Sequence, residues 1–248
     1  MADSGVFGKA VVITMEKNFV YGTLEGFDEE VGKHLYSLFV SICRVKDNYI
    51  HYTYHVPENA NKDKIQKKRG KIEKSQVERV FAYELYHQWS NVIDNRLNAN
   101  LLINSELPKN IISYDETEHL YYPDMILHLG QDKSKGNIIA CEIKRKEYVE
   151  KNPKEMIEDL KKLRVLLDKE SKALPYMEGW EPFTYGVFIE VVKAVECRSE
   201  DYSTDLIKKH LLNKRLGIPE EIMKRIICIV YNGYVIKYDT LYDLIKGN

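Results

Sequence analysis

Two short segments of this chain carry residues whose types and spacing could do chemistry. Pro123-Asp124 directly precedes the apolar run 125–129, and Glu142-Ile143-Lys144 directly follows the apolar run 138–141. Both runs have the composition of buried strands, so the two carboxylates stand where a strand meets a turn. Because side chains alternate along a strand, Glu142 and Lys144 project from the same face. An anion and a cation therefore share one surface.

The segment between the two runs predicts how they meet. Residues 130–137 are polar and begin with a glycine, which is the composition of a hairpin loop. We therefore expect antiparallel neighbouring strands that bring Asp124 near Glu142. Two carboxylates beside a lysine suit Mg²⁺, with Mn²⁺ as a substitute, because this hard ion takes one or two carboxylates together with phosphate and water oxygens. Such an ion can activate a water, and Lys144 could orient that water or stabilise charge on the phosphate.

These residues resemble a known family. A Pro-Asp on one strand, a Glu-x-Lys on the next and a preceding helix with a glutamate are similar to the PD-(D/E)XK nuclease superfamily. The resemblance spans about residues 73–192, roughly half of the chain. It implies an α/β fold with a restriction-endonuclease-like core, a central mixed β-sheet flanked by helices in the order αβββαβ. It also implies Asp124 and Glu142 as metal ligands and Lys144 as the catalytic lysine.

The expected upstream helix supplies a third carboxylate. Residues 73–97 contain no glycine or proline and carry apolar residues at helical spacing. Steps of three and four from Phe81 reach Glu84 and Gln88, so both border the apolar stripe. A buried carboxylate needs a partner, and a metal cluster would be one. By the resemblance, Glu84 completes the acidic cluster and also binds metal, with Glu78 as the alternative.

Further residues around these positions are candidates for substrate binding. Gln88 could contact a substrate phosphate or a ligated water. Tyr83 and His87 flank Glu84 and could line a nucleic-acid groove, where aromatic rings stack on bases. Arg145 and Lys146 add positive charge directly at the motif.

Structural roles compete with these interpretations. Asp124, Glu142 and Lys144 could form only a buried ion pair at a sheet end. Tyr83 could be a packing residue, His87 a hydrogen-bonded histidine and Gln88 a helix-surface amide. An unrelated α/β enzyme with a chance motif is a further alternative, and it would leave Asp124 and Glu142 far apart.

Composition places the chain among ordinary soluble proteins. Its 248 residues are 44% hydrophobic and 30% charged, with a formal net charge of −1. The four cysteines are scattered singly, which favours reduced thiols over a disulfide framework. No apolar run is long enough to cross a bilayer, and the first residues lack the pattern of a signal peptide. We therefore expect a cytoplasmic protein without a membrane partner.

Charge is distributed unevenly along the chain. A basic run occupies residues 62–74, just before the expected helix. We divide the chain into an N-terminal α/β extension (1–60), a basic linker (61–72), a nuclease-like core (73–195) and C-terminal helices with a β-hairpin packed on the core (196–248).

The sequence therefore predicts metal-dependent phosphodiester hydrolysis of nucleic acid, most readily by an endodeoxyribonuclease. The Gln-x-x-x-Tyr signature of the exonuclease branch is missing from the expected second helix, residues 153–172. Cutting both strands of a duplex often uses two active sites, so a homodimer is compatible with this activity. The alternative is a non-catalytic module that binds nucleic acid or protein and has kept the nuclease-like fold.

Overall fold

The computed structural model describes the chain between residues 9 and 246, with interruptions. The described residues are 9–11, 27–46, 49, 78–93, 100–105, 123–129, 136–145, 153–170, 181–192, 207–208, 211, 216–233 and 236–246. Lys146, the basic run 62–74 and the linker 61–72 lie outside them, so the predictions made for these residues stay predictions.

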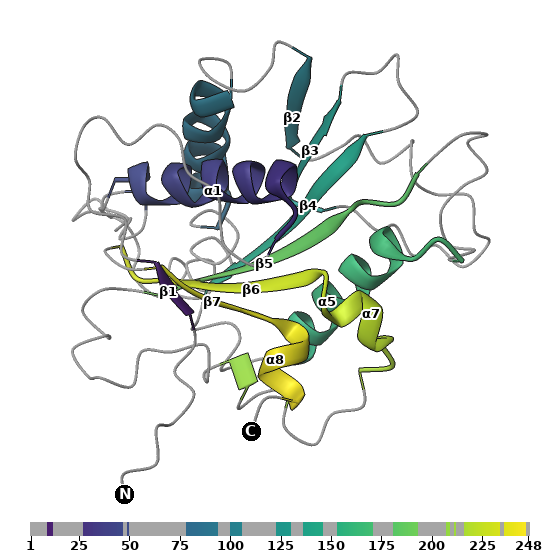
Figure 1. Ribbon diagram of the computed structural model, residues 1–248. Coiled ribbons are helices and arrows are strands. Elements are labelled where there is room, and N and C mark those ends of the chain that lie inside the picture. Colours follow the sequence, from purple (N-terminus) through teal and green to yellow (C-terminus); the bar gives the residue numbers. More distant parts are fainter. Residues whose placement is uncertain are drawn as a thin grey trace, which may run out of the picture.

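The described residues form an α/β structure with one mixed, open sheet (Figure 1). The elements in chain order are β1 (Lys9–Val11), α1 (Glu29–Arg44), a helix over residues 78–93, β2 (Leu101–Ser105), β3 (Met125–Leu129), β4 (Asn137–Arg145), α5 (Pro153–Leu167), β5 (Tyr185–Val191), α7 (Glu220–Met223), β6 (Ile226–Tyr231), β7 (Ile236–Thr240) and α8 (Leu241–Lys246). The strands lie in the order β1-β7-β6-β5-β4-β3-β2. β4, β5 and β6 are parallel neighbours, and the remaining neighbours are antiparallel.

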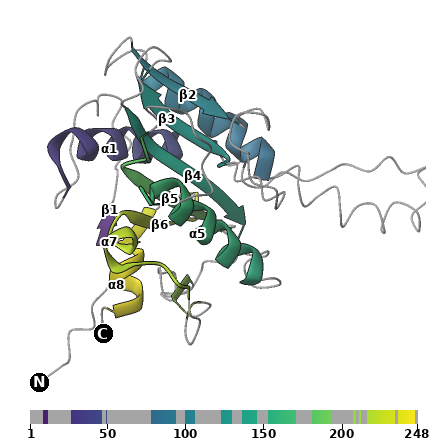
Figure 2. The ribbon, with the colours of Figure 1, turned by 90° about the vertical axis from the view of Figure 1, so that its right-hand side faces the viewer.

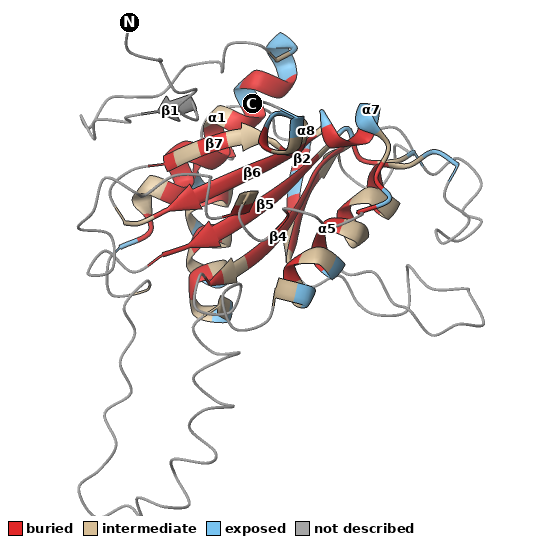
Figure 3. Ribbon diagram, turned by 90° about the horizontal axis from the view of Figure 1, so that it is seen from below, coloured by how far each residue is buried: buried red, intermediate tan, exposed pale blue. Residues whose placement is uncertain are grey.

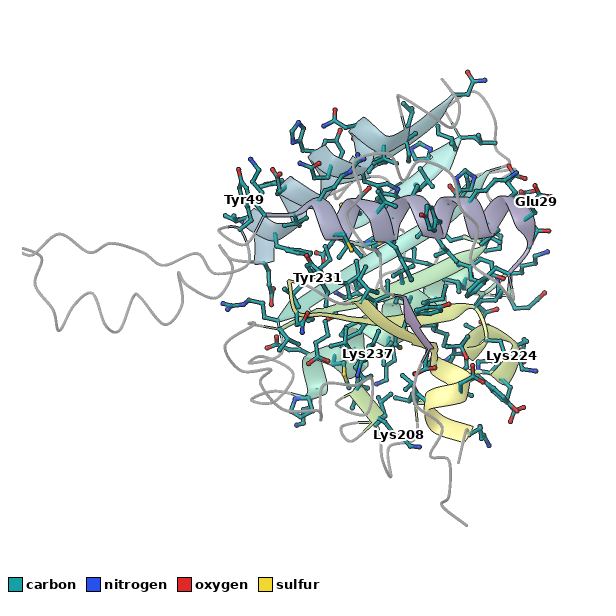
Figure 4. The ribbon with its side chains drawn as sticks, turned by 60° about the vertical axis from the view of Figure 1, so that its left-hand side comes forward. Glu29, Tyr49, Lys208, Lys224, Tyr231 and Lys237 are labelled. Atoms are coloured by element: carbon teal, nitrogen blue, oxygen red, sulfur yellow. The ribbon has the colours of Figure 1, made fainter. Side chains whose placement is uncertain are left out.

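Helices cover both faces of this sheet (Figure 2). On one face, α1 and the helix 78–93 pack their apolar stripes, and the core there includes Leu35, Phe81 and Trp89. Trp89 donates its indole N–H to Ser37 Oγ at 2.9 Å, which ties the two helices together. Tyr231, labelled in Figure 4, ends β6, and its ring centroid lies 6.4 Å from that of Phe81. These contacts fix the helix 78–93 over the sheet.

The opposite face is covered by α5, α7 and α8. Helix α5 begins with Pro153, whose fixed φ and missing N–H suit the first turn of a helix. Leucines along one side of α5 pack on β4 and β5, which are buried on both faces as parallel strands usually are (Figure 3). This face carries the candidate site.

The α/β class and the mixed sheet flanked by helices are confirmed. From residue 78 to residue 191 the described elements follow as helix, three strands, helix and strand, in the predicted order. The expected strands β3, β4 and β5 are present, and so is the C-terminal hairpin of β6 and β7. Helix α1, which we assigned to the N-terminal extension, shares a core with the helix 78–93. The described residues include no helix long and apolar enough to span a membrane.

A glycine helps to set the register of β3 and β4. Gly136 has a φ of 138°, which side chains other than glycine rarely allow. Its carbonyl accepts from the Leu129 N–H at 2.9 Å, and a Cβ added to it would lie 2.7 Å from Leu129 Cδ1. The contact between Gly136 and Leu129 thus joins β4 to the end of β3.

We predict that Gly136→Ala lowers the free energy of unfolding by about 2 kcal/mol or more, because both the backbone conformation and the contact with Leu129 become strained. Gly217→Ala is the matched control, since Gly217 also has a positive φ of 64° but nothing lies within 4 Å of an added Cβ. It should cost only about 1 kcal/mol. Urea unfolding followed by circular dichroism measures both. Equal losses would show that Leu129 does not restrict this turn.

Candidate active site

The ends of β3 and β4 place Asp124 beside the Glu-x-Lys segment. Met125 pairs with Cys141 in the antiparallel register, which leaves Asp124 next to Glu142 and Ile143. The Ile143 backbone N–H donates to Asp124 Oδ2 at 2.7 Å. The carboxylate therefore caps the pairing of the two strands at this end. The structure brings the two acidic residues of the motif together, contrary to the alternative in which they lie far apart.

Glu142 and Lys144 face α5. Ala140, two residues before Glu142, belongs to the core between the sheet and α5, and Phe188 pairs with Glu142 on β5. The Glu142 side chain is only 1% exposed, whereas that of Lys144 is 17% exposed. The carboxylate thus lies at the bottom of this region and the amine lies nearer its edge.

Two residues of α5 complete the arrangement. Asp159 Oδ2 lies 3.3 Å from Lys144 Nζ, and Asp159 Oδ1 accepts from Lys162 Nζ at 2.6 Å. Lys162 Nζ also lies 3.7 Å from Glu142 Oε1. Lys144 of β4 therefore contacts Asp159 of α5, and Lys162 of α5 contacts Glu142 of β4. The result is a crossed set of charges that joins β4 to α5.

The helix 78–93 contributes Glu78. Glu78 Oε1 accepts from the Arg145 backbone N–H at a long 3.4 Å. Glu78 also interacts electrostatically with Lys144, Asp124 and Asp159. We call Glu78, Asp124, Glu142, Lys144, Asp159 and Lys162 the lysine–carboxylate cluster.

Burial and mutual repulsion destabilise the ionised carboxylates of the cluster. Burial raises the pKa of Glu142 well above its usual range, and repulsion from Asp124 and Asp159 adds to this. Burial likewise raises the pKa of Asp124, against the Ile143 hydrogen bond and the attraction of Lys144, which lower it. Burial also raises the pKa of Glu78. The lysines therefore compensate these charges only in part.

The two lysines stay protonated. Burial alone would lower the pKa of Lys144, but attraction by Asp159, Glu78, Asp124 and Glu142 outweighs burial and raises it. The pKa of Lys162 is raised in the same way by Glu142 and Asp159 against its own burial. Lys144 can therefore donate hydrogen bonds and stabilise negative charge, but it is not a general base in this state.

The cluster fits a divalent cation. Its four carboxylates and two ammonium groups leave two negative charges uncompensated when all are ionised, which is the charge of one such ion. Glu142 Oε1 is buried and makes no hydrogen bond, although Lys162 is within ion-pair distance. The donors are hard oxygens, which Mg²⁺ and Mn²⁺ prefer.

Protein groups would not surround the ion by themselves. Across the described ranges, no group of three or more His, Cys, Asp or Glu side chains is arranged to hold a metal. Asp124 and Glu142 would supply two ligands, and water and substrate oxygens would supply the others, as is usual for Mg²⁺.

Glu84, the predicted helix carboxylate of the acidic cluster, contacts residues of its own helix. Glu84 accepts from Gln88 Nε2 at 2.7 Å, and its other oxygen lies 3.7 Å from His87 Nδ1. Six residues of helix separate it from Glu78, which is about 9 Å along the axis and a rotation of about 240°. The structure thus brings Glu78 to Asp124 and Lys144, and Glu84 binds partners on its own helix.

Helical phase alone does not separate the two glutamates, because Glu78 and Glu84 stand three residues on either side of Phe81. The buried positions are the apolar residues that the spacing predicted, Phe81, Leu85, Trp89, Val92 and Ile93. Glu84 borders the stripe, with an 11% exposed side chain, as its place in the sequence predicted.

Some of the candidate substrate-binding residues do not lie at the cluster. Tyr83 is 52% exposed and the His87 side chain is 65% exposed, so both lie on the surface of the helix 78–93. Gln88 is engaged with Glu84. Arg145 is buried, and its backbone N–H donates to Glu78. Lys146 lies outside the described residues.

Sequence reasoning missed Asp159 and Lys162, although one signal was available. Asp159 lies within the apolar stripe of α5, between Met156 and Leu163, and it is only 3% exposed. A carboxylate in such a stripe needs a buried partner. The sequence does not reveal that this partner is Lys144, because the contact depends on how α5 packs on β4.

Comparisons of this chain with family models, with curated proteins and with solved structures find no match. We therefore infer its function from the geometry of the lysine–carboxylate cluster alone.

We predict that Glu142→Gln stabilises the metal-free protein at pH 7 by on the order of 1 kcal/mol or more. At a pH above 4.5, the ordinary pKa of this side chain, Glu142 keeps its proton in the folded state, whereas it is ionised in the unfolded state. Stability of the wild type therefore falls as the pH rises from about 4.5 toward the raised pKa, and the glutamine removes this loss.

Urea unfolding in the presence of a chelator, between pH 4 and pH 8, tests this expectation. The advantage of Glu142→Gln should grow with pH and vanish near pH 4. Glu158→Gln, on the exposed side of α5, is the control and should show no such trend. An advantage that shrinks as the pH rises would contradict the sign of the pKa shift.

Proposed function

We propose that this protein is a magnesium-dependent nuclease that hydrolyses phosphodiester bonds in nucleic acid, acting as an endonuclease on DNA. The observation that carries the proposal is the buried carboxylate of Glu142, which lies beside Asp124 with too little positive charge around it. A divalent cation would supply the missing charge. A site that holds such an ion beside protonated lysines is suited to a substrate with phosphate groups.

Each residue of the cluster has a distinct part in this proposal. Asp124 and Glu142 would hold the ion. When bound, it would polarise the phosphate and lower the pKa of a water. Lys144, which stays charged, donates to the attacking water or to the phosphate oxygens. Asp159 and, next to it, Glu78 favour the charged form of Lys144, and Glu78 is the helix carboxylate of the site.

The reaction is a displacement at phosphorus. The water oxygen forms a bond to phosphorus, the bond to the leaving sugar oxygen breaks, and the water proton leaves the nucleophile while the leaving oxygen gains a proton. Charge accumulates on the phosphate oxygens in the transition state, and Lys144 is placed to stabilise it.

The arrangement of elements supports a restriction-endonuclease-like core. A helix with an acidic residue precedes three antiparallel strands, and the second and third of these carry Asp124 and the Glu142-Lys144 pair. A helix and a parallel strand follow. The free thiols of Cys43, which is partly buried, and of Cys141 and Cys228, which are buried, are compatible with a reducing compartment such as the cytoplasm. We retain the homodimer as a hypothesis of the same proposal.

A non-catalytic binding module is the second candidate function, and one observation favours it. Lys144 and Lys162 already pair with Asp159, so the cluster could serve only to stabilise the fold. Such a module would bind nucleic acid in a salt-dependent way without hydrolysis and without a metal requirement.

We predict that the purified protein cleaves plasmid or single-stranded DNA in Mg²⁺ or Mn²⁺. Asp124→Asn should lower the cleavage rate by about two orders of magnitude or more, because loss of a metal ligand removes several kcal/mol of transition-state stabilisation. Gel electrophoresis of the products measures this. Glu158→Gln is the matched control and should cleave like the wild type. Equal cleavage by Asp124→Asn, with its circular dichroism spectrum unchanged, would refute the proposal.

We further predict that Glu78→Gln and Glu84→Gln differ in activity. Glu78→Gln should lower the cleavage rate by roughly tenfold or more, because Lys144 loses a charged neighbour. Glu84→Gln should change the rate by less than about threefold, since the contacts of its carboxylate among the described residues are with Gln88 and His87. The same cleavage assay under matched conditions compares them. A larger loss in Glu84→Gln would restore Glu84 as the helix carboxylate of the site.

A further inference from the structure

Lys162 differs from the rest of the buried cluster in its access to solvent. Its side chain is 29% exposed, compared with 4% for Asp159 and 1% for Glu142. A polyanion that approaches these buried carboxylates from solvent would meet Lys162 before it meets Glu142. Positive charge at the edge of a negative site is needed there, because the carboxylates alone would repel phosphate.

Asp159 holds Lys162 and Lys144 at the same time. Its two oxygens are divided between the amines, with Oδ1 2.6 Å from Lys162 Nζ and Oδ2 3.3 Å from Lys144 Nζ. Asp159 is itself buried on α5. One carboxylate therefore fixes the positions of two ammonium groups relative to each other. In this arrangement Asp159 can hold both ammonium groups in position to act on one ligand.

The contact between Lys162 and Glu142 is the weaker one. Their 3.7 Å separation is an ion pair without a hydrogen bond, and Glu142 Oε1 accepts no hydrogen bond from the described residues. An ammonium group has three donors, and one of those of Lys162 goes to Asp159. If a cation takes over Glu142, Lys162 keeps its anchor on Asp159 and has donors left for an anion.

We propose that Lys162 is a phosphate-binding residue for a nucleic-acid strand and that Asp159 is the positioning residue that holds it. Lys162 stands next to Glu142 in the metal-free protein and turns its free donors to a backbone phosphate when a divalent ion occupies the site. This role rests on the proposed function, since it names a contact to the substrate of the same site. The two lysines then have different roles, because Lys144 acts at the reacting phosphate and Lys162 binds a phosphate of the strand.

Equilibrium binding tests this role without requiring cleavage. The probe is a fluorescein-labelled oligodeoxynucleotide, single-stranded or duplex, titrated with protein in Ca²⁺ and followed by fluorescence anisotropy over a series of salt concentrations. Lys162→Gln should raise Kd by roughly tenfold or more, as expected for loss of a charge-assisted hydrogen bond. It should also reduce the slope of log Kd against log salt by about one, because one phosphate contact is lost.

Three other variants make the result specific. Lys161→Gln removes the same charge from the next residue, which is exposed and pairs with Glu158, and should leave Kd and the slope close to wild type. Lys162→Arg keeps a phosphate donor and should retain the slope. Lys162→Met keeps the aliphatic stem and should reproduce the loss seen with glutamine. Thermal unfolding of each variant shows that the fold is intact.

The outcomes distinguish the two proposals. No binding by the wild type, or equal Kd and slope for Lys162→Gln and Lys161→Gln, overturns the role of Lys162 even if the wild type cleaves DNA. The role of Lys162 is also overturned if Lys162→Arg reduces the slope of log Kd against log salt as much as Lys162→Gln does. Failure of the wild type to cleave in Mg²⁺ overturns the proposed function, whatever the binding measurements show.

Discussion

Burial of carboxylates at the end of β3 and β4 is the constraint on which the site depends. Asp124 is fixed by the Ile143 N–H, and Glu142 is enclosed between the sheet and α5. Ionised groups in such a place are costly unless positive charge surrounds them. Lys144 and Lys162 provide part of it, and the raised pKa of Glu142 shows that the compensation is incomplete.

Helix α5 makes the cluster part of the fold. Its leucines pack on β4 and β5, and the same packing delivers Asp159 and Lys162 to the face where Glu142 and Lys144 project. The crossed contacts between β4 and α5 join the helix to the sheet at the cluster. Occupation of the site by an ion would replace one of these pairs with a stronger interaction. Stability and function are thus linked through the same few charges.

Local rules predicted one half of the site and tertiary packing determined the other. Strand alternation placed Glu142 and Lys144 on one face, and the polar loop predicted the antiparallel pairing that brings Asp124 to them. The helix carboxylate could not be assigned in this way, because Glu78 and Glu84 both border the apolar stripe and only tertiary packing decides which of them lies near Asp124. Asp159 and Lys162 could not be assigned, because no local pattern fixes how α5 lies on the sheet.

A crystal structure of the protein grown with Mn²⁺ tests the central claim most directly. The anomalous signal of manganese locates the ion independently of the protein atoms. We predict a peak between the carboxylates of Asp124 and Glu142, with Lys162 moved away from Glu142 and still bonded to Asp159. A fully occupied manganese position elsewhere, with Glu142 unchanged beside Lys162, would contradict the account and leave the cluster as a structural ion network.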